Sequence, residues 1–344
     1  MDLNTLLTFS AQQGASDLHL SSGLPPMIRV DGDVCRVNQP DLTDEDIRRL
    51  LNSSMSDDQR QQYIDELELD YAVEVPGVSR FRVNAFNQNR GAGAVFRTIP
   101  NDIWTMDDLG LGQVFKNICN QPNGIVLVTG PTGSGKSTTL AAMIDYINET
   151  RSEHILTVED PIEFVHESKK SLVNQREVHK HTHSFANALK SALREDPDVI
   201  LVGELRDLET IRLALTAAET GHLVFGTLHT NSAAKTIDRL IDVFPAEEKS
   251  IVRGMLSESL QAVISQVLLK KKSGGRVAAH EIMLGTPAIR NLIREEKVAQ
   301  MYSVMQTSSG VGMQTLDQAL TSLVMRGVID AKTAQERAKK PADF

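Results

Sequence analysis

The segment 130–138, GPTGSGKST, constrains the fold of this chain more than any other part of the sequence. It fits the pattern G-x-x-x-x-G-K-[ST], with Gly130, Gly135, Lys136 and Ser137 at the fixed positions. The apolar run 125–129 precedes it and the helix-forming segment STTLAAMIDYINE follows it, which predicts a strand, a loop and a helix in that order. Glycines let backbone N–H groups curve around phosphates, and a helix N-terminus adds partial positive charge. The segment therefore predicts a site for a nucleoside triphosphate.

All nine residues of this loop are candidate nucleotide contacts: Gly130, Pro131, Thr132, Gly133, Ser134, Gly135, Lys136, Ser137 and Thr138. We expect the Lys136 ammonium to reach the β- and γ-phosphates. The Ser137 hydroxyl is the expected ligand of Mg²⁺. The loop indicates ATP and Mg²⁺ but does not say what their hydrolysis drives.

From about residue 113, short apolar runs alternate with longer helical patterns. These runs are GIVLVTG (124–130), HILTVED (154–160), DVILVGE (198–204) and GHLVFGTLH (221–229). Such alternation is typical of an α/β domain with a mainly parallel sheet. After about residue 250 the pattern predicts mostly helix, interrupted by KKKSGGR at 270–276.

Carboxylates follow two of these predicted strands. Glu204 ends DVILVGE and is a candidate for the magnesium-water chemistry, although Gly203 stands where many such enzymes have Asp. Pro161 turns the chain after HILTVED and places Glu163 just past the strand end, where open α/β sheets bind ligands. A carboxylate there can orient or deprotonate an attacking water. Whether Glu163 or Glu204 is the general base stays open.

Two groups of histidines are candidate functional residues. His229 ends the run 221–229 at the expected ligand edge, where it can sense the γ-phosphate by a hydrogen bond. His222 begins the same run and is either catalytic or a contact between strands or subunits. His179, His181 and His183 alternate in VHKHTHSF, a spacing that permits metal binding, but a surface loop is the preferred interpretation.

Residues 1–100 form a separate pattern, that of a small α+β domain. The runs SRFRVNAF (79–86) and AGAVFRTI (92–99) predict a hairpin whose loop centre lies near residue 89. Arg82 and Arg97 should then lie nearly opposite each other on one face, either as a solvated strand face or as an anion site. Residues 101–112 are the expected linker.

Composition excludes several classes of protein. The chain has 344 residues, 41% hydrophobic and 24% charged, which excludes a largely disordered chain. Its net charge of −9 does not favour a dedicated nucleic-acid binder. Cys35 and Cys119 lie far apart, so we expect reduced thiols. We find no signal peptide in MDLNTLLTFS and no apolar run long enough to span a bilayer.

Four motifs together resemble the secretion ATPase superfamily of type II secretion and type IV pilus motors: GPTGSGKST, VEDPIEF (158–164), LREDPDVILVGELRD (193–207) and GHLVFGTLHT (221–230). The block AIRNLIRE at 288–295 resembles the pilus retraction branch. The chain carries too few cysteines for the tetracysteine zinc insertion of pilus assembly motors, and it is too short for their extra N-terminal region.

The resemblance implies a PAS-like domain at 1–100 and a RecA-like ATPase domain at 113–344 with a helical C-terminal part. It implies a homohexameric ring with nucleotide bound between the domains. Glu163 matches the catalytic glutamate of the family, Glu204 the magnesium-associated glutamate and His229 the phosphate-contacting histidine. Arg82 and Arg97 match arginines that approach the nucleotide.

The resemblance also implies partners and a place in the cell. A retraction motor would lie in the cytoplasm at the pilus base, associated peripherally with the inner membrane. It would act on a platform protein in that membrane and work beside a paralogous retraction ATPase. The alternative function is a nucleotide-binding accessory subunit that scarcely hydrolyses ATP, and a third is a RecA-like motor on nucleic acid.

The block AIRNLIRE also has a physical interpretation. As a helix it predicts an apolar stripe of Ala288, Ile289, Leu292 and Ile293. Arg290 and Arg294 would form a basic pair one helical turn apart beside this stripe. An ordinary amphipathic surface helix and a helix that couples to a partner both fit this pattern, and the resemblance favours the second.

Overall fold

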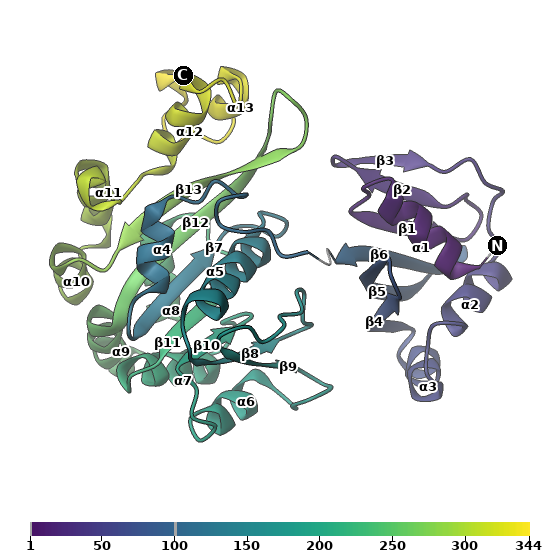
Figure 1. Cartoon of the computed structure of the whole chain (residues 1–344), viewed down its shortest axis with the longest axis horizontal. Helices are drawn as coiled ribbons and strands as arrows, with labels where there is room; N and C mark the ends of the chain where they lie inside the picture. The colour runs from purple at the N-terminus through teal and green to yellow at the C-terminus, as the bar shows by residue number, and fades with distance from the viewer. Residues whose placement is uncertain (1, 100–101) are drawn as a thin grey trace. The chain divides into compact units, whose positions relative to one another are not determined.

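The computed structural model describes residues 2–99 and 102–344. The chain divides into two compact units, Met1–Asp102 and Ile103–Phe344 (Figure 1). Within the expected linker, 101–112, residue 101 lies outside the described residues. From Ile103 the segment packs into the second unit, where Met106 and Leu111 are buried, so it is not a free linker.

The first unit contains a six-stranded antiparallel sheet in the order β3-β2-β1-β6-β5-β4. Its strands are β1 Asp17–Ser21, β2 Met27–Val30, β3 Asp33–Arg36, β4 Glu68–Val75, β5 Ser79–Gln88 and β6 Gly91–Ile99. Its helices are α1 Leu3–Gln12, α2 Asp44–Asn52 and α3 Asp57–Glu66. Apolar side chains of all three helices join the core formed with the sheet, which confirms the α+β class.

Local sequence explains these elements. Thr43 and Ser56 each close a capping box at the start of α2 and α3, because their side chains accept from the backbone three residues on. Asp31 and Gly32 turn the β2–β3 hairpin with φ of 50° and 95°. Such positive φ values are typical of a tight hairpin turn.

The second unit contains a seven-stranded sheet in the order β13-β12-β7-β11-β10-β8-β9. Its strands are β7 Gly124–Thr129, β8 His154–Glu159, β9 Leu172–Glu177, β10 Val199–Val202, β11 Leu223–Leu228, β12 Leu260–Lys270 and β13 Arg276–Leu284. All neighbours pair in parallel except β12 and β13. The expected mainly parallel α/β sheet is confirmed.

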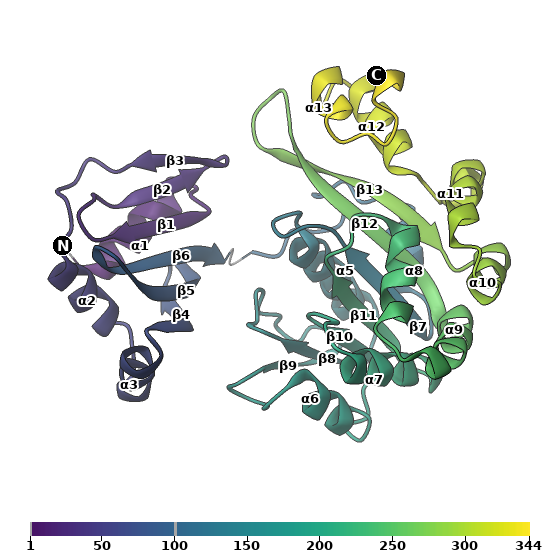
Figure 2. The ribbon, with the colours of Figure 1, turned by 180° about the vertical axis from the view of Figure 1, so that it is seen from behind.

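Helices cover both faces of this sheet. The helices of the second unit are α4 Gln113–Cys119, α5 Lys136–Thr150, α6 Phe185–Ala192, α7 Leu208–Glu219, α8 Ala233–Asp242, α9 Ala246–Ser259, α10 Pro287–Arg294, α11 Val298–Thr307, α12 Leu316–Met325 and α13 Ala331–Gln335. Figure 1 looks onto α4 and α5, and Figure 2 onto the face covered by α7, α8 and α9. Successive residues of β7 alternate between these faces, since Ile125 and Leu127 pack with α7 whereas Val126 and Val128 pack with α5.

The prediction of mostly helix after residue 250 is wrong for residues 260–284. Here β12 and β13 form a long antiparallel hairpin, and KKKSGGR spans the turn between them. The run Ala262–Gln266 is buried throughout, so its apolar residues show no alternation that would mark a strand. After residue 250 the chain is helical to the end of α9 at Ser259 and again from α10 onward.

The block AIRNLIRE forms α10, and Ile289, Leu292 and Ile293 are buried as predicted. Ala288 is exposed and does not belong to this stripe. Arg290 donates to the carbonyl oxygens of Gly285, Glu258 and Leu260, at 2.6, 2.5 and 3.1 Å. The arginine thus holds the last turn of α9 from the neighbouring helix. Among the described residues, no helix combines the length and the apolar character needed to span a bilayer.

Candidate functional site

The candidate site lies at one edge of the parallel sheet, where β7, β11, β10 and β8 end side by side. The phosphate-binding loop follows β7, and His229 directly follows β11. Glu204 lies two residues after β10, and Glu163 four residues after β8. Because the neighbouring strands are parallel, residues from four separate segments of the chain meet at this edge.

Glycines shape the loop itself. Gly130, Gly133 and Gly135 have φ of 144°, 77° and 86°, values that side chains rarely tolerate. A Cβ atom on Gly130 would lie 2.3 Å from the Gln266 carbonyl oxygen. Helix α5 begins at Lys136, so its first N–H groups have no acceptor within the helix. The loop and this helix end together provide donors suited to phosphate oxygens.

Lys136 crosses the loop. Its ammonium donates to the carbonyl oxygens of Gly130 and Pro131, at 2.8 and 3.2 Å. Burial lowers the pKa of Lys136, while the nearby charges of Glu204 and Glu163 raise it. Lys136 and both strand-end carboxylates therefore belong to one electrostatic cluster.

Glu204 lies at the centre of that cluster. Its carboxylate lies 3.0 Å from His229 Nε2 and 2.6 Å from the Arg206 guanidinium. Burial acts to raise the pKa of Glu204, but the hydrogen bonds and charges of Arg206 and His229 together hold this pKa below its ordinary value. Glu204 is therefore an ionised carboxylate, available to bind a cation or a polarised water.

Steric crowding explains why a glycine occupies position 203. A Cβ atom at this position would lie 3.2 Å from both the Val158 carbonyl oxygen and the Glu159 Cα, which are backbone atoms of the adjacent strand. The Thr227 hydroxyl also donates to the Gly203 carbonyl oxygen. The structure therefore leaves little room for an acidic side chain before Glu204.

Glu163 lies in the segment 160–171, which β9 holds in place. Gln175 donates to the Phe164 carbonyl oxygen at 2.8 Å and accepts from the His166 N–H at 2.7 Å. The Glu163 N–H donates to the Glu159 carboxylate at 3.4 Å. Burial raises the pKa of Glu159 to about 7, although hydrogen bonds from Thr157 and others oppose this effect.

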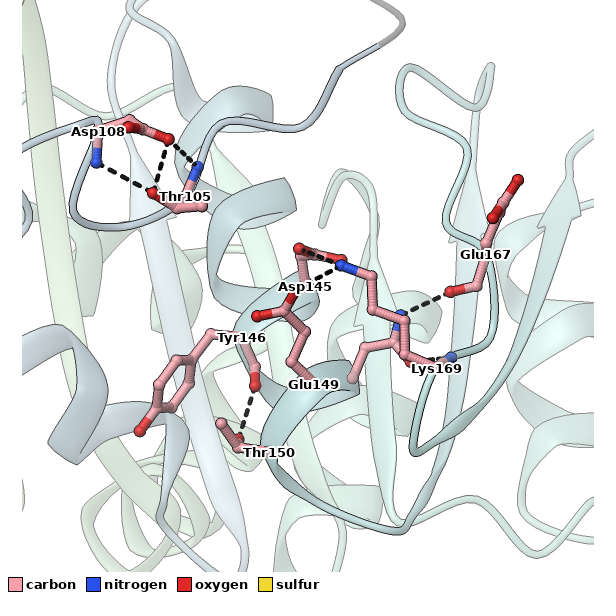
Figure 3. Close-up of polar contacts among 9 residues, drawn as sticks. Thr105, Asp108, Asp145, Tyr146, Glu149, Thr150, Glu167 and Lys169 are labelled. Carbon is pink, nitrogen blue, oxygen red and sulfur yellow. Dashed lines mark hydrogen bonds and ion pairs between the residues drawn. The ribbon is translucent and has the colours of Figure 1, made fainter.

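Lys169 ties the other end of this segment to α5 (Figure 3). Its ammonium lies 2.9 Å from the Asp145 carboxylate and 2.7 Å from that of Glu149. Asn148 accepts from the Lys169 N–H at 2.9 Å and donates to the Glu167 carbonyl oxygen at 2.7 Å. The segment that carries Glu163 is therefore fixed to the helix that begins at the phosphate-binding loop.

A family model for type II/IV secretion system proteins matches residues 1–336. This chain belongs to the type II/IV secretion system protein family. The type IV pilus retraction ATPase PilT of Pseudomonas aeruginosa is 71% identical over 344 residues, which are 100% of both chains. A twitching motility protein of Neisseria gonorrhoeae is 64% identical over 315 residues, covering 91% of this chain and 84% of that protein.

A solved structure supports the same relationship. The crystal structure of the pilus retraction motor PilT with bound ADP superposes with a TM-score of 0.91 at 50% identity. The match covers 100% of this chain and 99% of that one. This member of the type II/IV secretion family thus shares the fold of a chain that was solved with bound ADP.

Within the second unit, the structure brings Glu163, Glu204 and His229 to the phosphate-binding loop, but not His222. His222 precedes β11, at the edge of the sheet opposite to His229. Its Nδ1 lies 2.9 Å from the carbonyl oxygen of Ala217, in the last turn of α7. His222 therefore lies apart from the cluster around Glu204 in this chain, and its two interpretations, a catalytic residue and a contact between strands or subunits, both stay predictions.

Arg82 and Arg97 are direct cross-strand partners in the β5–β6 hairpin, as the loop position predicted. Arg97 donates to the Asp17 carboxylate at 3.0 Å, and Arg82 lies 3.9 Å from that of Asp70. Both arginines are partly exposed and share one face of their sheet. This arrangement concentrates two guanidinium groups on a surface that carries two acids.

The histidines of VHKHTHSF lie in the turn region after β9. The His181 ring accepts from the Glu177 N–H at 3.0 Å, and the His179 N–H donates to the Thr182 carbonyl oxygen at 2.7 Å. His183 is exposed. This geometry fits the preferred interpretation as a surface loop.

No local pattern predicted Lys169, Gln175, Gln266 and His280. Each contacts a segment on another element, from 9 to 132 residues away, so no motif contains both partners. The signal that does exist is a polar residue inside an apolar run, such as Gln266 within AVISQVLL. A buried polar side chain needs partners, and this need points to a specific network.

Proposed function

We propose that this chain is a Mg²⁺-dependent ATPase that works as a homohexameric motor and powers retraction of type IV pili. The observation that carries the proposal is the cluster of Lys136, Glu204 and His229 at the end of three strands of the sheet. The full-length similarity of the chain to a pilus retraction ATPase favours pilus retraction over the other functions of the family.

The residues present suit ATP and Mg²⁺. The loop and the N-terminus of α5 would hold the phosphates, with Lys136 turning from its two carbonyl acceptors to phosphate oxygens. Ser137, in the first turn of α5, and Glu204 supply oxygen donors of the kind that Mg²⁺ prefers. When bound, Mg²⁺ would neutralise charge on the β- and γ-phosphates.

We propose that Glu163 or Glu204 orients or deprotonates the attacking water. We propose that His229 contacts the γ-phosphate. Because His229 already contacts Glu204, a phosphate that draws His229 away would change the charge balance at Glu204. Arg82 and Arg97 would supply positive charge to the phosphates in the assembled ring, with guanidinium groups matched to phosphate oxygens.

The remaining parts of the proposal concern partners. We propose that the motor acts on a pilus platform protein of the inner membrane, associates peripherally with that membrane from the cytoplasm, and works beside a paralogous retraction ATPase. The similarity to retraction and twitching motility proteins supports this assignment.

Two substitutions test the enzymatic part. Lys136→Ala and Glu204→Ala should each abolish phosphate release from ATP in a folded protein. Near-normal hydrolysis by either variant would refute the site. The accessory-subunit function is favoured by Gly203, which stands where an acid is usual. Calorimetry that finds ATP binding without turnover in the unmodified protein would select that alternative.

A further inference from the structure

Gln266 lies in the middle of β12 and is almost completely buried, with 1% of its surface exposed. Its Nε2 donates to the Ser134 carbonyl oxygen at 2.6 Å, across 132 residues of sequence. Its own carbonyl oxygen is the atom that a Cβ on Gly130 would meet. Gln266 therefore contacts the phosphate-binding loop through both its side chain and its backbone.

The bond to Ser134 fixes a peptide plane. The Ser134 carbonyl and the Gly135 N–H belong to the same trans peptide, so they point in opposite directions. Holding the carbonyl toward β12 therefore turns the Gly135 N–H away from the Gln266 side chain. Gly135 permits this orientation because its φ is 86°.

A second set of contacts fixes the Gln266 amide. Its Oε1 lies 2.8 Å from the Thr139 hydroxyl on α5 and 3.2 Å from His280 Nε2 on β13. If the amide were reversed, its oxygen would face the Ser134 carbonyl oxygen, and two acceptors would meet. The contacts therefore determine a single orientation of the amide.

The surroundings of His280 fix its ring as a hydrogen-bond donor to the Gln266 side chain. Its ring meets that of Phe115 at a centroid distance of 5.1 Å and an angle of 71°. Burial lowers the pKa of His280 to about 4, so the ring is neutral near pH 7. Because the Gln266 oxygen can only accept, the neutral ring must carry its proton on Nε2.

We propose that Gln266 is a positioning residue for the phosphate-binding loop and that His280 holds Gln266 in place. Gln266 orients the Ser134–Gly135 peptide so that the Gly135 N–H is presented to a phosphate oxygen of the bound nucleotide. The β12–β13 hairpin thus prepares the nucleotide site from behind the loop. The inference rests on the proposed function, since it assumes that the loop binds ATP and ADP.

The test compares Gln266→Met with Gln261→Met. Gln261 lies on the same strand, and its Nε2 donates to the Asn123 carbonyl oxygen at 2.8 Å, so the control loses the same kind of bond away from the loop. Measurements are the Kd for ADP, the KM for ATP, kcat, and the Tm without nucleotide. We expect Gln266→Met to raise both Kd and KM by about tenfold, the size of one lost buried hydrogen bond, and Gln261→Met to change neither.

A purely structural role gives a different result. In that case Gln266→Met would have a lower Tm than the unmodified protein. Its folded molecules, counted by the stoichiometry of ADP binding, would still bind ADP with the Kd of the unmodified protein. That outcome overturns the inference, as does equal weakening by both glutamine variants. If the unmodified protein itself fails to bind ADP, the proposed function falls together with this inference, so the two failures are distinguishable.

Three further variants cover the case in which Gln266→Met does not fold. Gln266→Glu has nearly the same shape, but its carboxylate cannot donate to the Ser134 oxygen, so it should weaken ADP binding as well. His280→Phe keeps a ring beside Phe115 but loses the donor, whereas His280→Gln retains one. Weaker ADP binding in His280→Phe with recovery in His280→Gln supports the inference, and equal binding by both contradicts it.

Discussion

His229 Nε2 lies 3.0 Å from Glu204 Oε1, and this contact joins the carboxyl ends of the adjacent strands β10 and β11. Glu204 also binds Arg206, so its carboxylate has two cationic or polar neighbours before any nucleotide is bound. A phosphate group that attracts His229 would compete with Glu204 for the same ring nitrogen. The pair therefore links phosphate binding to the state of the carboxylate.

Glu204→Gln should separate turnover from binding. The amide keeps the shape of the side chain but loses the negative charge, so we expect kcat for ATP hydrolysis to fall by about 10²–10⁴-fold. The Kd for ADP should change by much less, because the loop and Lys136 still hold the phosphates. Glu167→Gln, an exposed acid in the segment after β8, is the control and should keep normal turnover. Normal turnover by Glu204→Gln would exclude Glu204 from the chemistry.

Lys169→Met should reduce turnover through Glu163. The substitution removes the ammonium that binds Asp145 and Glu149 and so loosens the segment 160–171 from α5 (Figure 3). We expect kcat to fall by about tenfold with little change in the Kd for ADP, because a small displacement of a reacting group is costly. Lys170→Met is the matched control, since Lys170 is the exposed neighbour. Equal kcat in both variants would show that Lys169 does not position Glu163.

The raised pKa of Glu159 predicts that the free energy of unfolding depends on pH. Its folded-state pKa is about 7 and its ordinary value is 4.5, so the folded protein binds more protons than the unfolded chain between these pH values. The free energy of unfolding should therefore fall as pH rises from about 4.5 to about 7, by about 3 kcal/mol from this group. Glu159→Gln cannot ionise and should lose this part of the pH dependence. Denaturant unfolding of both proteins at pH 5 and pH 8 measures the difference, and an identical pH dependence would contradict the assignment.

Arg290→Ala should destabilise the second unit. It removes three hydrogen bonds from a charged donor to carbonyl oxygens around the end of α9, for which we expect a loss of about 3 kcal/mol in the free energy of unfolding. Arg294→Ala removes one exposed ion pair with Glu258 and should cost about 0.5 kcal/mol. Chemical denaturation compares the two variants. If both variants lose the same free energy of unfolding, Arg290 does not hold the end of α9.

Local sequence patterns predicted the phosphate-binding loop and the residues that follow the strand ends. The loop after β7 follows from a nine-residue motif, and Glu204 and His229 follow from their places at strand ends. The hairpin register correctly paired Arg82 with Arg97, because one loop position fixes all pairs of a regular hairpin.

Other features depend on contacts that no local pattern contains. The strands β12 and β13 were missed because a run of consecutive buried residues in the middle of each shows no alternation. His222 and His229 were both candidates because a histidine at either end of an apolar run gives the same signal. Gln266 was missed because its partners Ser134 and Thr139 lie 132 and 127 residues away.

The central claim is tested most directly by Mg²⁺-dependent phosphate release from ATP, measured per chain against protein concentration. If the subunits of a ring complete each other's sites, activity per chain should rise as the ring assembles and then become constant. Lys136→Ala should show no release at any concentration. A verified oligomer of the unmodified protein that releases no phosphate from ATP would contradict the claim.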